Sequence, residues 1–481
     1  MKRGKPLLLG LWITPVWGLT GCVSIPFTNH PNHSIHSLPT NHSDDQGETP
    51  KVLVAPPNPT GELPPVANEI IPQGTVPFAN LVSIQATDVV TEVLQRNQSL
   101  VAMGKALQAA QAKFPQAITL EDPSVGGWFA PGTIGSNQVD FAMRLELSQK
   151  VPGRGKRQLR GEMAQAQAKA SENDLGSLRL LLEENASNAF YDLYFVQRAL
   201  EVSENTRKIL VEFRQNAETR YRNGQTPQQD ILQADVELGL QKEKAITLLR
   251  MQNVAKARIN TLMHLEPDLP IPPSVKDISL QPEKRNGEEL RQEARANRPD
   301  LLSLAEIVRA DESAVQLAKR EFSPDYEAMA SYDSFWQGMD KQMQFQLGVR
   351  LNIPARLARR YAALKEAQSR LAQHKAEYDQ LVDQIHFQVQ ESLEQVRESS
   401  QILELFQNTT LKATQANARE AQDSYITGKV PFLTLVAAQK EQAMTQDRYY
   451  QAQAEAFRRK AALDRATGGT RMDSVSSNPH P

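Results

Sequence analysis

Few residues in this chain of 481 have the types and spacing needed for covalent chemistry. The sequence has no nucleophile paired with a base, no phosphate-binding glycine loop and no Cys/His metal spacing outside one short segment. That segment holds His30, His33, His36 and His42, half of all the histidines. Histidine-rich tracts can collect metal ions, but scattered histidines in a polar tether are the simpler interpretation. We therefore expect no enzyme, no cofactor and no fixed metal site.

The single cysteine, Cys22, lies where a modification is expected. Three basic residues among the first five are followed by an apolar run from Leu7 to Leu19 and then by Thr20-Gly21-Cys22. This order is typical of a secretory signal, and the run is too short to span a bilayer. The end of the signal resembles a bacterial lipobox, which predicts a signal peptide over residues 1–21 and lipidation of Cys22. A lone thiol after an ordinary signal is the alternative. By the same resemblance, Val23 rather than aspartate favours sorting to the outer membrane.

Residues 22–83 are predicted to be a flexible tether. Between Val23 and Asn80 the chain places 11 of its 29 prolines and one basic residue, Lys51. Such a composition buries too little apolar surface to fold. The net charge of −2 and the pI near 6.5 give no reason to expect a nucleic-acid partner.

One short frame, Tyr-x-x-Gly-x-x-Pro, occurs twice. It includes Tyr221, Arg222, Gly224 and Pro227 in the first copy, and Tyr425, Gly428 and Pro431 in the second. Glycine takes a left-handed conformation at a helix end, and proline suits the first turn of the next helix. Each copy therefore predicts the tip of a helical hairpin, and the duplication predicts an internal two-fold repeat.

Long proline-free segments on both sides of each tip predict helices. The first hairpin is expected over 153–222 and 228–264, and the second over 356–424 and 432–466; shorter helices are expected over 86–113 and 288–320. About 70 residues at the helical rise make a helix of roughly 105 Å. Apolar residues at coiled-coil spacing mark a buried stripe on each first arm: Ala189, Leu193, Val196 and Leu200, and Ile385, Val389, Leu393 and Val396.

Alternating apolar and polar residues predict strands in both halves. The runs 141–148, 326–332 and 345–353 alternate, each about the length of a tilted membrane-spanning strand. Phe114-Pro115 is expected to end a helix, as Phe322-Ser323-Pro324 does in the second half. A fourth, short strand is expected over 116–121, followed by a Gly/Pro-rich loop over 122–138.

Four strands cannot close a membrane barrel, because the smallest use eight. An open sheet in lipid would leave backbone groups unpaired, at several kcal/mol each. Several copies of the chain must therefore pool their strands if these enter a membrane.

In its motifs the chain resembles the TolC family of outer-membrane efflux proteins, in particular its lipoprotein branch. The resemblance rests on both hairpin tips, on the strand–Pro–helix junctions at Pro152 and Pro354, and on Asn297-Arg298-Pro299-Asp300-Leu301. It implies a mainly α fold with a small transmembrane β part: a homotrimer whose 12-stranded barrel in outer-membrane lipid, four strands per chain, continues as a periplasmic α-helical barrel. It further implies hairpin tips that meet a periplasmic adaptor, which is coupled to an inner-membrane RND-type pump. The repeats would span residues 84–283 and 284–467, with a flexible tail over 468–481.

The resemblance also implies an acidic ring that narrows the channel near the tips. Asp230 occupies that position in the first hairpin, whereas its counterparts in the second, Thr434 and Ala437, are not acidic. An aspartate that merely favours its own helix N-terminus is the alternative. Arg220 and Arg222 are candidates to reach the adaptor or a neighbouring helix, or they form a solvated face.

Three further expectations concern the sheet and the class of protein. Trp128, Phe129 and Trp336 are placed for an aromatic girdle or for ordinary loop packing. The strand charges Arg144, Glu146 and Arg350 should face water. A periplasmic coiled-coil lipoprotein without a channel, such as an adaptor or an adhesin-like stalk, is the competing class. The sequence does not identify the cargo, which would be metal cations or small toxic compounds.

Overall fold

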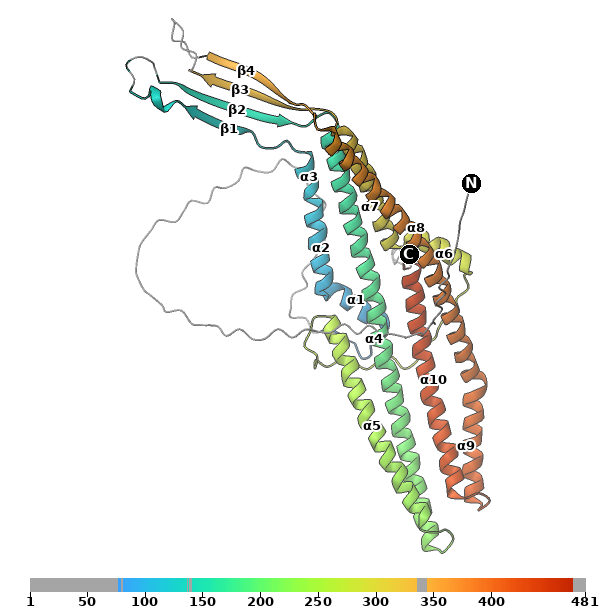
Figure 1. Cartoon of the computed structure of the whole chain (residues 1–481). Helices are drawn as coiled ribbons and strands as arrows, with labels where there is room; N and C mark the ends of the chain where they lie inside the picture. Colours follow the sequence, from blue (N-terminus) through green and yellow to red (C-terminus); the bar gives the residue numbers. More distant parts are fainter. Residues whose placement is uncertain (1–76, 79–80, 136, 138–140, 335–343, 470–481) are drawn as a thin grey trace, which may run out of the picture. The chain divides into compact units, whose positions relative to one another are not determined.

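The computed structural model describes residues 77–78, 81–135, 137, 141–334 and 344–469. This part of the chain is mainly helical, with one four-stranded antiparallel sheet (Figure 1). The predicted signal peptide, Cys22, the four clustered histidines, Trp336 and nearly all of the tether and tail lie outside the described residues. Among the described helices, none has both the length and the apolar character required to cross a membrane.

Both halves contain, in this order, short helices, two strands and a long helical hairpin, which confirms the internal repeat. The first repeat consists of α1 (Ala86–Arg96), α2 (Gln98–Gln111), α3 (Lys113–Ile118), β1 (Ser124–Phe129), the 3₁₀ turn η1 (Pro131–Thr133), β2 (Met143–Val151), α4 (Lys156–Arg222) and α5 (Gln229–Leu262). The second consists of α6 (Gly287–Asn297), α7 (Pro299–Arg320), β3 (Asp325–Asp333), β4 (Gln344–Asn352), α8 (Leu357–Leu405), the π-helix η2 (Phe406–Thr410), α9 (Leu411–Ile426) and α10 (Phe432–Ala466).

The core lies between the long helices. Helix α4 packs against α5, α7 and α10, and α8 packs against α7 and α10. The predicted stripes lie in these contacts: Leu193 and Val389 are fully buried, and Leu200 is half-buried. Burial of such a stripe stabilises a helix more than its intrinsic propensity does, because most helical stability in proteins comes from packing.

The predicted end of the first short helix is wrong. Helix α2 ends at Gln111, and after Ala112 the chain continues as α3 through Phe114 and Pro115 to Ile118, so that the first half of the predicted strand 116–121 is helical. Proline is tolerated there because Pro115 lies in the first turn of α3, where the N–H group has no intrahelical partner. The first helical segment is therefore nearly as long as its counterpart, α7.

The predicted loop over 122–138 is also wrong in part, because it contains β1. Gly126 and Gly127 lowered the apparent strand propensity. The structure explains Gly126: a Cβ atom there would lie 2.7 Å from Cη2 of Trp128, whose ring covers the glycine. The glycine in this strand makes room for an aromatic ring, a use of strand glycine that sequence patterns do not reveal.

Candidate functional site

One face of the sheet is apolar and exposed. The strands pair in the order β1-β2-β3-β4, with Leu145 opposite Tyr332 and Ala330 opposite Leu347. On β4 the side chains of Phe345, Leu347 and Val349 are 67%, 77% and 70% exposed. Apolar residues at every second position, with nothing packed on them in the described chain, form a surface suited to lipid.

The opposite face carries a connected polar network. Arg350 on β4 lies 3.0 Å from Glu327 on β3 and 4.0 Å from Glu146 on β2. The hydroxyl of Ser148 donates to Glu327 at 2.9 Å and lies 2.8 Å from the hydroxyl of Ser124 on β1. The register thus places Arg144, Glu146 and Arg350 on one face, as predicted from the alternation. Linked charges on one side and apolar side chains on the other match a membrane strand that faces water inside and lipid outside.

The sheet has two free edges. Within the described residues, β1 pairs only with β2 and β4 only with β3. Phe129 lies on the apolar face and is 60% exposed, whereas Trp128 lies opposite Arg144 on the polar face. Of the two described girdle candidates, Phe129 alone is therefore directed to the lipid-compatible face.

A buried lysine fixes the first strand–helix junction. Lys156, 1% exposed, donates from Nζ to Asp325 at 2.9 Å, to the Ser323 carbonyl at 3.0 Å and to Glu321 at 3.3 Å. The backbone N–H of Gly153, next to Pro152, donates to the same Asp325 carboxylate at 2.7 Å. These contacts join α4 of the first repeat to the turn before β3 of the second. At the other junction, Pro354 lies between β4 and α8 without an equivalent lysine.

Both hairpin tips have the predicted backbone. Gly224 and Gly428 adopt φ of 69° and 75°, in the left-handed region. In the first tip the N–H of Gln225 donates to the Arg220 carbonyl, and in the second the N–H of Lys429 donates to the Ser424 carbonyl, at 2.9 and 2.8 Å. This is the Schellman arrangement that closes a helix. Pro227 and Pro431 then precede α5 and α10.

The two tips meet in a cluster of Arg220, Asp230 and Tyr425. Arg220 donates from Nη1 to the Tyr425 carbonyl at 2.7 Å, and its Cζ lies 4.8 Å from the centre of the Tyr425 ring. Burial raises the pKa of Asp230, partly offset by the Arg220 charge and by Tyr425. Burial and the Asp230 charge raise the pKa of Tyr425 in turn. An arginine from the first hairpin thus holds the second hairpin, next to a carboxylate.

The two copies of the Tyr-x-x-Gly-x-x-Pro frame have different environments, and most of the other tip residues are exposed. Tyr221 is 44% exposed, whereas Tyr425 is buried and packs against Phe432 with ring centres 5.5 Å apart. Arg222 pairs with Glu218 on its own helix at 2.6 Å. Thr434 and Ala437 are exposed. Of the two arginines, Arg220 reaches the neighbouring hairpin and Arg222 belongs to the solvated surface.

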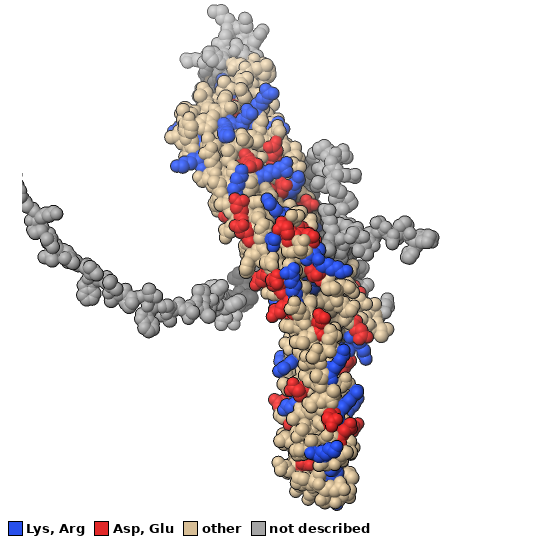
Figure 2. Space-filling view, turned by 90° about the vertical axis from the view of Figure 1, so that its right-hand side faces the viewer, with Lys and Arg blue, Asp and Glu red and all other residues tan. Residues whose placement is uncertain are grey.

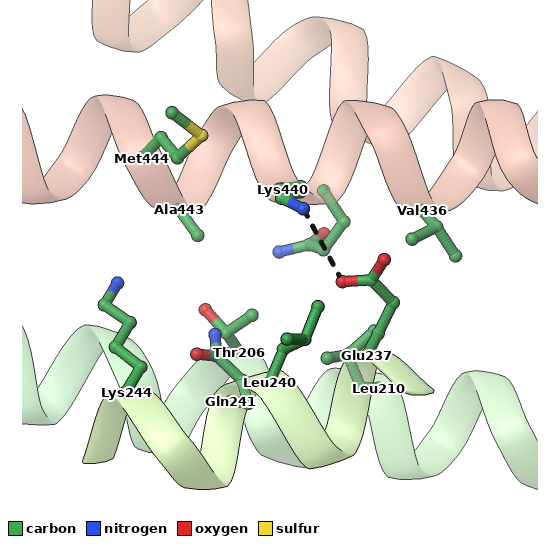
Figure 3. Close-up of a pocket in the computed structure, with 11 residues that line it drawn as sticks. Thr206, Leu210, Glu237, Leu240, Gln241, Lys244, Val436, Lys440, Ala443 and Met444 are labelled. Carbon is green, nitrogen blue, oxygen red and sulfur yellow. Dashed lines mark ion pairs between the residues drawn. The ribbon is translucent and has the colours of Figure 1, made fainter. Parts of the chain in front are cut away.

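A groove separates the hairpins above the tips (Figure 3). Its volume is about 160 Å³, and its apolar lining includes Leu210, Leu240, Val436 and Met444 from α4, α5 and α10. Two ion pairs cross between α5 and α10: Glu237 with Lys440, at 3.8 Å, and Lys244 with Asp447. On α5, Leu232, Val236 and Leu240 are about half-exposed. The groove is therefore an open apolar depression crossed by two ion pairs, rather than a closed hydrophobic core.

The surface of the helical part carries charged side chains of both signs. Figure 2 shows positive and negative side chains interspersed along the helical part, with no large patch of a single sign on that face. No group of three or more His, Cys, Asp or Glu that could hold a metal ion occurs in the part of the chain that the structure describes.

Sequence reasoning missed the groove and its ion pairs. A signal was present, because Glu237 and Lys244 are seven residues apart on α5, and the opposite charges Lys440 and Asp447 are seven apart on α10. Residues at this spacing share a helix face, so the reciprocal pattern predicts pairing between two helices that run in the same direction from adjacent tips.

The two-faced sheet, whose edges are unpaired among the described residues, and the paired helical hairpins suit a protein that inserts a sheet into a membrane. Residues 290–469 match the family described as "Outer membrane efflux protein". Residues 290–469 thus match an outer membrane efflux protein domain, and the chain shares its fold with solved outer-membrane channels.

Several solved structures share this fold. The channel CusC is 18% identical, with a TM-score of 0.69 over 81% of this chain and 93% of its own. VceC, an outer membrane protein of Vibrio cholerae, is 18% identical, with a TM-score of 0.67 over 80% and 96%. The outer-membrane channel OprN is 21% identical, with a TM-score of 0.65 over 80% and 90%. A comparison with curated protein sequences gives no match.

Proposed function

We propose that this protein is the outer-membrane exit channel of a tripartite efflux pump. It conducts its cargo passively from a periplasmic adaptor and an inner-membrane RND-type pump to the outside. The observation that carries the proposal is the exposed apolar face of a sheet with two free edges. A periplasmic stalk or adaptor has no use for such a face, because exposed apolar patches are costly in water.

Oligomerisation follows from the free edges. Pairing of β1 of one copy with β4 of the next satisfies the backbone groups of both edges, which lipid cannot do. Three copies supply a 12-stranded barrel, as in the TolC-like trimer that the sequence motifs imply. The polar face with Arg350, Glu146 and Glu327 then lines a water-filled lumen.

The hairpin tips form the periplasmic end. In this assembly Asp230 is repeated around the symmetry axis as a single acidic ring, which attracts cations. Because Arg220 holds the second hairpin at Tyr425, outward movement of that hairpin requires this contact to break. We assign the narrow point of the channel to this cluster.

The groove between the hairpins is the site for the adaptor. An apolar floor of Leu240, Val436 and Met444, bounded by Glu237, Lys440 and Lys244, suits the apolar stripe of a partner helix. The exposed tip residues, among them Tyr221, Arg222 and Gly224, give the adaptor its end contact.

The remaining assignments rest on the sequence. We propose lipidation at Cys22, a tether over 22–83, repeats over 84–283 and 284–467, and a tail over 468–481. The cargo is metal cations or small toxic compounds, and the choice between them is made by the pump.

Reconstitution in planar bilayers tests the proposal. The purified full chain should give discrete, cation-selective conductance steps. In cells, Cys22→Ala should abolish labelling by radioactive palmitate, whereas substitution of Val23 by Ala should leave labelling intact. A protein that gives no conductance and fractionates with the soluble periplasm would be a stalk, and the channel proposal would be wrong.

A further inference from the structure

A polar cavity lies between the two repeats, and no residue that lines it belongs to the sheet or to the tips. Its volume is about 530 Å³, within the range of sites for small organic ligands. The walls come from α4, from the connector at 276–280, from the end of α8 with the π-helix η2, and from α10. A ligand there would touch both halves of the chain.

Arg198 is the buried charge of this cavity. Its side chain lines the wall and the residue is 5% exposed. Nη1 donates to Glu201 at 2.7 Å, and Cζ lies 5.7 Å from the centre of the Tyr194 ring. Nε–H has no hydrogen-bond partner within the residues that the structure describes. Buried donors in folded proteins are normally satisfied, so this one requires a partner that is not part of the described chain.

The other walls of the cavity contain several hydrogen-bond donors. Tyr449 accepts from Gln407 at 3.2 Å, so its own hydroxyl hydrogen can donate elsewhere. Burial raises the pKa of Tyr450, which therefore stays protonated and able to donate at neutral pH. Lys276 at the exposed rim adds a positive charge, and Asp277 is the one acidic residue of the described lining. The described lining thus holds two cationic residues and one acidic residue, and Glu201, which is not part of the lining, pairs with Arg198.

The π-helix contributes to this wall. Residues 406–410 form one π turn inside an otherwise α-helical segment, and Gln407, which it carries, reaches Tyr449 on α10. Short π segments occur frequently at functional sites. Here the irregular turn lines the same cavity as the unsatisfied arginine, which is a second and independent indication of a site.

We infer that this cavity binds a small organic anion, with a carboxylate or phosphate group against Arg198 and the tyrosine hydroxyls of α10. The guanidinium supplies charge-assisted hydrogen bonds, and the rings of Tyr194 and Tyr450 cover the rest of the ligand. The inference does not depend on the proposed channel function, because the site lies within one chain.

Isothermal titration calorimetry on the purified full chain tests the inference. Inorganic phosphate and succinate are the probes, with sodium chloride at matched ionic strength as the blank. We expect saturable binding of at least one probe, and the stronger of the two identifies the head group. Arg198→Lys keeps the charge but removes Nε, and Tyr450→Phe removes one hydroxyl, so each should weaken binding at least ten-fold.

The matched control is Arg207→Lys. Arg207 lies on the same helix and pairs with a glutamate three residues away, as Arg198 does, but it is outside the cavity. This variant should bind as the wild type does. The absence of saturable binding of either probe would overturn the inference and leave a cavity filled by water. Binding unchanged in Tyr450→Phe and in any folded Arg198→Lys protein would also overturn it.

Discussion

Placing one arginine on either face of β4 tests the orientation of the sheet. Leu347 and Gln346 are neighbours near the middle of the strand, and their side chains point to opposite faces. Leu347 is 77% exposed on the apolar face. Gln346 lies opposite Ser331, which is also opposite Glu146 on the polar face. The substitutions Leu347→Arg and Gln346→Arg therefore add the same charge to the same strand at nearly the same depth.

The expected effects differ widely. An arginine on the lipid face near the bilayer midplane costs about 2–4 kcal/mol. Three copies in one barrel would raise this to about 6–12 kcal/mol per assembly. At Gln346 the new side chain meets water and lies near the Glu146 carboxylate, so we expect less than about 1 kcal/mol.

The assay is the amount of heat-modifiable oligomer in the outer-membrane fraction. Leu347→Arg should reduce this band at least ten-fold, while circular dichroism of the purified protein shows that the helices remain folded. Gln346→Arg should reduce the band by less than about five-fold. Equal loss in the two variants, or the greater loss in Gln346→Arg, would refute the assignment of the faces.

Three further predictions concern the tips and the junction. Asp230→Asn should reduce cation selectivity in planar bilayers, and unchanged selectivity would remove Asp230 from the narrow point of the channel. Because burial raises the pKa of Asp230, the selectivity of the wild type should fall on acidification at a higher pH than an exposed aspartate would give. Lys156→Met should lower the free energy of unfolding by about 1–3 kcal/mol, because the Asp325 carboxylate loses its buried cation but keeps the Gly153 N–H. Lys150→Met, on an exposed side chain, should change it by less than about 0.5 kcal/mol; similar losses in thermal unfolding of the two variants would argue against a stabilising role of the buried lysine. Gly428→Ala should lower the free energy of unfolding by about 1–2 kcal/mol, because Gly428 has a left-handed φ. Gly239→Ala, inside α5 with open space around it, should raise the free energy of unfolding by up to about 1 kcal/mol. An increase in both variants would contradict the tip geometry.

The repeated architecture could be predicted because its signals are local. Period-two alternation predicted the ends of β2, β3 and β4 within three residues, and the Gly-x-x-Pro spacing predicted both hairpin tips. Glycine at φ near 70° and proline before a helix depend on backbone geometry alone. Such features can be predicted without knowing which residues pack against them.

Strand β1 could not be predicted because its two glycines are typical of a loop and its extended form depends on pairing with β2. Gly126 is covered by the ring of Trp128, and the pairing of β1 with β2 rather than local propensity holds the segment extended. Pro115 misled for a related reason, since proline ends a helix in its interior but not in its first turn.

Local sequence patterns could not predict the tip cluster or the groove, because both depend on contacts between different hairpins. Arg220 and Tyr425 belong to different hairpins, and their contact depends on how the two tips lie together. The pairing of Glu237 with Lys440 likewise depends on the relative register of α5 and α10. A pattern within one helix shows which face is polar but not which partner will meet it.

One chain supplies four strands in its described residues, too few to close a barrel, and must therefore share the barrel with its copies. Native mass spectrometry of the detergent-purified protein tests this directly. We expect a complex of three chains, each carrying a lipid-modified mature N-terminus, that remains intact when it is released from its detergent micelle. A single chain, stable in water without detergent, would contradict it.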